Sequence, residues 1–181
     1  MTPCQWYLFG STRSRTLDEQ GTLFTVAEMA IGMAGFSAIV VMFKRRGSGR
    51  WDPADADRFN GMLLHSIAAG FFCILPSVLQ TFTREVATTW LLGSAALGLQ
   101  VLVHTCIVLR LPSSSWRVKA LVGILGLLVA ALQLANVTRL GFDREFGPYL
   151  VGVLWHMFQA GLLFLMLIWV RASDVGGGEG E

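Results

Sequence analysis

Residues 26–43 read VAEMAIGMAGFSAIVVMF, an apolar stretch interrupted by one carboxylate, that of Glu28. With residues 23–25 it makes a run of 21 residues that contains no other charged residue. At about 1.5 Å per residue, a helix of this length is long enough to cross a hydrocarbon core of about 30 Å. The stretch therefore predicts a membrane-spanning helix, and it makes Glu28 the anomaly to explain.

Glu28 shares one helical face with two glycines and an isoleucine, so the part of this face next to the carboxylate has almost no side chain. At spacings of four, seven and eleven residues, this face also holds Gly32, Gly35 and Ile39. A carboxylate facing lipid is costly, and small residues mark the places where another helix approaches closely. We therefore expect this face, with Glu28, to point inward, toward protein or a wet cavity.

The whole chain repeats the composition of this first stretch. It has 181 residues, of which 54% are hydrophobic and only 14% charged, whereas an ordinary soluble domain has about 25% charged residues. Apart from Glu28, five runs contain no Asp, Glu, Lys or Arg: 23–43, 59–79, 86–109, 120–137 and 149–170. The sequence predicts an all-α, polytopic five-helix transmembrane bundle over residues 23–171. A polar N-terminal segment, 1–22, precedes it, with a loop at residues 14–19, and a flexible tail, 172–181, follows it.

The basic residues predict the orientation. With five spans, nine Lys and Arg residues lie on the side of the C-terminus and five on the side of the N-terminus. The positive-inside rule then places the N-terminus outside and the C-terminus in the cytoplasm of a cell inner membrane. The first connection carries a basic surface suited to anionic headgroups, formed by Lys44, Arg45, Arg46 and Arg50. The formal net charge of +2 gives no reason to expect nucleic acid as a partner.

The polar residues within the spans fall into two expected layers, by their distance along each helix. An outer layer would contain Glu28, His156, Gln133 and Asn136, and an inner layer would contain His65 and His104. Gln100 lies one turn before His104, and Gln159 lies three residues after His156. Because these residues lie on the faces rich in Gly and Ala, we expect them to point at one another rather than at lipid. Glu28 and His156 would then be partners.

Three functional hypotheses follow. The leading one is a homo-oligomeric channel, transporter or membrane sensor, in which an ion or proton pathway uses these Glu, His, Gln and Asn side chains, since histidine titrates near neutrality. The second is a non-catalytic scaffold or accessory subunit that binds a cytoplasmic or membrane partner. The third is a redox subunit that binds quinone, or haem between His65 and His104.

Other chemistry finds little support in the sequence. The three histidines lie on three different runs, without the spacing that fixes a metal on one helix, so no metal site is expected. No nucleophile lies one turn from a histidine with a carboxylate behind it, and we therefore do not expect an enzyme.

Overall fold

The computed structural model describes residues 3–48, 53–83, 85–110 and 116–175, with side chains for 18–42, 53–83, 85–110 and 116–168. Within these ranges the chain forms five α-helices and no strand. The helices are α1 (Pro3–Ser48), α2 (Pro53–Phe82), α3 (Val86–Arg110), α4 (Trp116–Thr138) and α5 (Phe146–Val175). Each contains a stretch long and apolar enough to cross a membrane. The predicted all-α fold with five membrane-spanning helices is confirmed.

All five helices extend beyond their apolar runs, and α1 extends furthest. Helix α1 begins at Pro3 rather than near Leu23, so that the backbone of residues 14–19, expected to be a loop, is helical. Helix α5 begins at Phe146, and Pro148 lies in its first turn. Proline is tolerated there because the first backbone N–H groups of a helix have no partner within it. Hydropathy thus locates the membrane-crossing part of a helix, whereas the helix itself continues past it.

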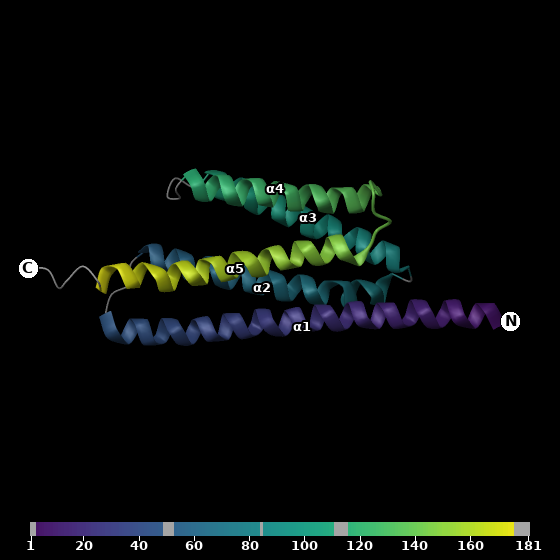
Figure 1. Ribbon diagram of the computed structural model, residues 1–181, viewed down its shortest axis with the longest axis horizontal. Helices are drawn as coiled ribbons and strands as arrows, with labels where there is room; N and C mark the ends of the chain where they lie inside the picture. Colours follow the sequence, from purple (N-terminus) through teal and green to yellow (C-terminus); the bar gives the residue numbers. More distant parts are fainter. Residues whose placement is uncertain (1–2, 49–52, 84, 111–115, 176–181) are drawn as a thin grey trace, which may run out of the picture.

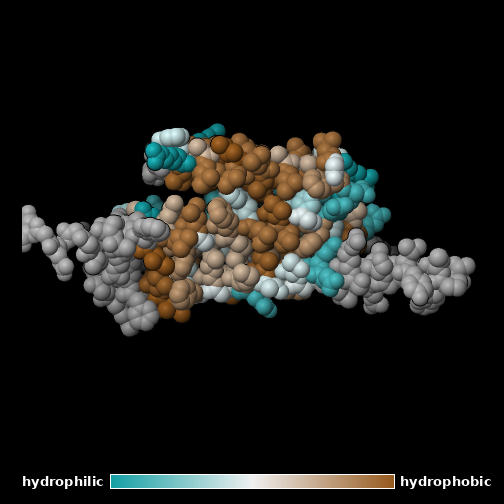
Figure 2. Space-filling model, viewed as in Figure 1, coloured by the Kyte–Doolittle hydropathy of each residue, from teal (hydrophilic) through white to brown (hydrophobic). Residues whose placement is uncertain are grey.

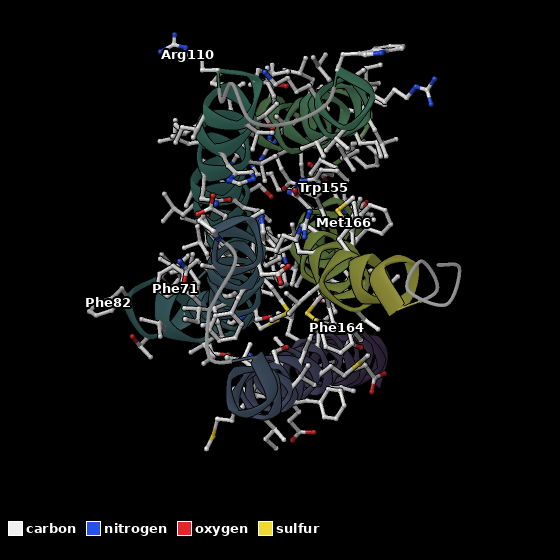
Figure 3. The ribbon with its side chains drawn as sticks, turned by 90° about the vertical axis from the view of Figure 1, so that its left-hand side faces the viewer. Phe71, Phe82, Arg110, Trp155, Phe164 and Met166 are labelled. Carbon is white, nitrogen blue, oxygen red and sulfur yellow. The ribbon has the colours of Figure 1, made fainter. Side chains whose placement is uncertain are left out.

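The helices run up and down, and their axes are roughly parallel (Figure 1). The end of the bundle where α1 begins, and where α2 meets α3 and α4 meets α5, is called the N-side below. The opposite end, with the C-terminus, is called the C-side. Seen end on, the bundle has an elongated cross-section: α3 and α4 form one pair, α2 and α5 lie in the middle, and α1 lies at the far edge (Figure 3).

Most of the surface between the two ends is apolar. Within the candidate spans, only 22–39% of residues are buried inside the chain, although all five spans are hydrophobic. Large apolar side chains such as Ile31, Phe71, Leu99 and Leu128 are more than half exposed, and Figure 2 shows the resulting hydrophobic band. Such a surface is stable against lipid rather than water. The fold is that of a small multi-pass integral membrane protein.

Small residues bring α3 and α4 together. A Cβ atom added to Gly98 would lie 2.8 Å from Cβ of Gln133, and one added to Gly126 would overlap Thr105. Close backbone approach of this kind is typical of helix packing in membranes. It makes α3 and α4 a tight pair, which contacts α2 and α5 as a unit.

Candidate functional site

Three histidines from three helices meet in the middle of the bundle. Nδ1 of His65 on α2 lies 3.1 Å from Nδ1 of His156 on α5. The ring of His104 on α3 meets that of His65 edge to face, with centroids 4.5 Å apart. His156 is fully buried, His65 is 3% exposed, and His104 is half-buried. These three residues form what we call the histidine cluster.

Two neighbours fix the positions of the rings. The ring of Phe72 lies parallel to that of His156, at an angle of 6° and with centroids 6.0 Å apart. The side chain of Gln159 lies beside that of His104. The contact between His65 and His104 agrees with the expected inner pair. The role of these residues in a pathway stays a prediction.

Several polar atoms around the cluster have no hydrogen-bond partner among the described residues. These buried atoms are Ser66 Oγ, Gln100 Oε1, His104 Nε2, Trp155 Nε1, His156 Nε2 and Gln159 Nε2. They come from α2, α3 and α5, the same helices that supply the histidines. Buried polar atoms without a protein partner are ordinarily satisfied by water or by a ligand. This part of the bundle is therefore built for polar contents.

The expected separation into two layers is wrong for His156. If the apolar runs of α2 and α5 had their N-side ends at the same depth, Tyr149 would lie opposite Leu79. Instead, the hydroxyl of Tyr149 donates a hydrogen bond of 2.5 Å to the carbonyl oxygen of Phe72. From Leu79 to Phe72 is roughly 10 Å along the helix at 1.5 Å per residue. Helix α5 is therefore shifted toward the C-side, which moves His156 from the expected outer layer to His65.

Pro76 explains why Tyr149 bonds to Phe72. Proline has no backbone N–H, so Pro76 leaves the carbonyl group of Phe72, four residues earlier, without its helical partner. In an apolar environment such an orphan acceptor has to find a donor. The hydroxyl of Tyr149 supplies it. Sequence reasoning missed the role of Tyr149. The signal for it was Pro76, a buried proline that leaves the carbonyl group of Phe72 without a helical partner.

The expected partnership of Glu28 with His156 is also wrong. The two residues lie at similar depth, because the rings of Phe36 and Phe164, eight residues further along each helix, pack with centroids 5.7 Å apart. The buried face of α1, however, carries Leu23, Val26, Ala27, Ala30 and Ser37. Glu28, Gly32 and Gly35 lie on the opposite, exposed face, and no other described helix comes within 4 Å of a Cβ added to either glycine. Glu28 therefore points away from the histidines.

Gln133 and Asn136 hold helices together at the N-side. Asn136 Nδ2 donates to Ser94 Oγ at 2.9 Å and to the carbonyl oxygen of Glu145 at 3.0 Å, and its Oδ1 accepts from the backbone N–H of Glu145 at 2.9 Å. Gln133 Nε2 donates to the carbonyl oxygen of Pro148 at 2.6 Å. With Tyr149, these residues form what we call the N-side belt, in which only Gln133 Oε1 lacks a partner.

The basic surface of the first connection lies largely outside the described side chains. The backbone of Lys44, Arg45 and Arg46 belongs to the last turns of α1, and Arg50 lies outside the described residues. Their contact with headgroups stays a prediction.

The cluster does not fit haem as expected between His65 and His104. Two metal–nitrogen bonds of about 2 Å would place the two ligating nitrogens alone about 4 Å apart, with half an imidazole ring beyond each. Rings in edge-to-face contact with centroids 4.5 Å apart leave no room for a macrocycle between them. Among the described residues, no group of three His, Cys, Asp or Glu side chains is arranged to hold a metal ion.

The geometry suits proton exchange between neighbouring rings. A neutral imidazole donates from one nitrogen and accepts at the other, and it gains a second donor when protonated. Between two Nδ1 atoms 3.1 Å apart, one ring donates and the other accepts. A proton taken up on one ring can therefore be released from another.

Comparison of the chain with protein-family models, with curated proteins and with solved structures gives no match.

Proposed function

We propose that this small membrane protein takes up protons at its buried histidine cluster and passes them across the bilayer. The observation that carries the proposal is the contact between His65 and His156, two imidazoles that are almost completely buried and joined nitrogen to nitrogen at 3.1 Å. Intramembrane ionisable residues that face a bundle interior commonly serve ion pathways or proton relays. His104, Gln159 and Gln100 extend the polar path from this pair.

A scaffold is the second candidate, and the N-side belt favours it. Gln133 and Asn136 use their amides to join helices, which is the structural role that polar residues commonly have in membranes. If the histidines had only this role, both nitrogens of each ring would be paired with other helices. Nε2 of His104 and Nε2 of His156 have no such partner among the described residues. The proposal therefore assigns structure to the belt and proton transfer to the cluster.

Proteoliposomes with an imposed pH gradient and an internal pH dye test the proposal. His156→Asn keeps a hydrogen-bonding atom near the position of Nδ1 but removes the second ring nitrogen, so we expect proton flux to fall at least tenfold. Unchanged flux in a correctly folded His156→Asn protein would rule out the relay.

Glu28→Gln is the matched control. Glu28 lies at a similar depth but on the exposed face of α1, so this substitution should preserve the flux that depends on the histidines. If Glu28→Gln abolished flux and His156→Asn did not, the pathway would follow the face of α1 instead, as the sequence alone predicts.

The exposed face of α1 supports the homo-oligomer in this proposal. A carboxylate at the centre of a span costs about 3 kcal/mol against lipid, and the glycines beside Glu28 allow another helix to approach. We propose that a second copy covers this face, with one Glu28 carboxyl group donating to the other. Gly32→Ile should then shift the detergent-solubilised protein to the mass of a monomer, as measured by light scattering. An unchanged mass would exclude this contact.

The distribution of basic residues places the C-side in the cytoplasm of a cell inner membrane in this proposal, since nine of the 14 Lys and Arg residues belong to that side. Reactivity of a single cysteine in the C-terminal tail with an impermeant reagent, in intact and in opened cells, tests the orientation.

A further inference from the structure

On the N-side of the histidine cluster, the α3–α4 pair packs closely against α2 and α5. There, Leu97 of α3 and Val153 of α5 are fully buried. A Cβ added to Gly93 would lie 3.0 Å from the ring of Tyr149, and one added to Gly152 would lie 2.5 Å from Leu97. Together with the N-side belt, these contacts close the N-side end of the bundle above the histidines.

Burial decreases from the cluster toward the C-side. Along α3, Leu97 and Val101 are buried, at 0% and 1% exposure, but His104 and Val108 are half-buried. Along the face of α5 that meets the α3–α4 pair, Trp155 and Gln159 are each 6% exposed, and Leu162 and Met166 are half-buried. The two parts of the bundle thus separate gradually beyond the histidines.

The figures show the same opening. Figure 2 shows a notch below the α3–α4 pair toward the C-side end, and we call this notch the hollow. In Figure 3, Trp155 and Met166 lie on the side of α5 toward the α3–α4 pair, and Phe164 lies on the side toward α1. The described part of the chain leaves this hollow open.

Two buried donors on the α5 face toward the hollow lack a protein partner among the described residues. Trp155 and Gln159 lie on the face of α5 that borders it, and Nε1 of Trp155 and Nε2 of Gln159 have no partner among the described residues. Both atoms are hydrogen-bond donors. A hollow filled by acyl chains would leave these donors unsatisfied, at a cost that water avoids.

We propose that the histidine cluster is the blind end of a water-filled vestibule that opens only to the C-side. Protons and small polar solutes reach His104 and Gln159 from that side, and Tyr149, Leu97 and Val153 close the way to the N-side. The role of the vestibule rests on the proposed function: to transfer a proton across the membrane, the α3–α4 pair has to move away from Tyr149. The presence of water in the vestibule can be measured without any transport assay.

Single cysteines on α5 test the vestibule, in a chain where Cys4 and Cys106 are replaced by serine. Cys73 is fully buried and can stay. Proteoliposomes of determined orientation are treated with a charged, impermeant methanethiosulfonate, which reacts with thiols in water. We expect Met166→Cys and Gln159→Cys to react from the C-side only, with Gln159→Cys at least tenfold slower, and Val153→Cys to react from neither side.

Leu165→Cys is the matched control. Leu165 is a direct neighbour of Met166 and is 59% exposed, but it faces outward, where lipid surrounds it. It should therefore react at least tenfold more slowly than Met166→Cys, although its side chain is the more exposed of the two. Equal rates at 165 and 166, or no reaction at both 159 and 166, would overturn the vestibule, and reaction of Val153→Cys would overturn its blind end.

The outcome separates this inference from the proposed function. Labelling at 159 and 166 without proton flux in the unmodified protein would retain the vestibule and refute the relay. Flux that depends on His156 without labelling at these positions would retain the relay and refute the vestibule.

Discussion

The N-side belt and the histidine cluster both bury polar side chains from several helices, but they treat them in opposite ways. In the belt, Asn136 alone takes part in three hydrogen bonds, two of them with the backbone N–H and carbonyl groups of Glu145. In the cluster, His156 has a hydrogen-bond contact to His65, and its Nε2 has no partner among the described residues. Among the described residues, most polar atoms of the belt are paired, whereas several atoms of the cluster and its neighbours are not. The difference can be tested by removing groups from each region.

Asn136→Ala should have the largest effect on stability. It removes three hydrogen bonds and leaves the partly buried backbone groups of Glu145 unpaired, which predicts a loss of about 2–3 kcal/mol in the free energy of unfolding. Unfolding in mixed micelles measures it. Thr138→Ala is the control, because the exposed hydroxyl of Thr138 bonds only to carbonyl groups of its own helix. Equal losses in the two variants would show that the belt does not hold the helices together.

Tyr149→Phe should cost about 1–2 kcal/mol, because it leaves the carbonyl group of Phe72 without a donor in an apolar interior. Pro76→Ala restores the missing backbone N–H. In the Pro76→Ala background, Tyr149→Phe should therefore cost less than half as much. A double-mutant cycle measures the coupling, and strictly additive losses would contradict the link between Pro76 and Tyr149.

The sequence was sufficient for the parts of this structure that depend on local pattern. The five uncharged runs locate the spans, and the small-residue faces of α4 and α5 correctly place Gln133 and His156 between helices. The meeting of His65 with His104 also follows from counting residues along two helices of similar register.

The errors concern quantities that local pattern does not contain. The shift of α5 toward the C-side depends on a single long-range bond, from Tyr149 to the carbonyl group that Pro76 leaves free. The face of α1 with Glu28 and two glycines is indeed distinct, but periodicity cannot tell whether such a face meets its own chain or another molecule. The first error separated His156 from His65, and the second made Glu28 its expected partner.

Replacement of the buried histidine pair should cost less than replacement of either member. His156→Leu leaves His65 Nδ1 unpaired and should cost about 1–3 kcal/mol, whereas the double variant His65→Leu/His156→Leu removes both groups and should cost under about 1 kcal/mol. The same micelle unfolding measures all three variants. A double variant as unstable as Asn136→Ala would mean that the cluster, like the belt, exists to hold helices together.

Arg139→Gly should have the smallest effect, and it should stabilise the protein. Arg139 ends α4 with φ of 62°, a left-handed conformation that glycine adopts without strain, and the N–H of Leu140 closes the turn on the carbonyl oxygen of Ala135 at 2.9 Å. The ion pair with Asp143, 3.6 Å long, is exposed and contributes little. We expect a gain of about 0.5–1 kcal/mol. Arg144→Gly should change stability in the same direction, because Arg144 also has a positive φ, of 60°. The connection between α4 and α5 positions Glu145 for its hydrogen bonds with Asn136. If the gain in Arg139→Gly disappears in the Asn136→Ala background, the connection stabilises the bundle through the belt.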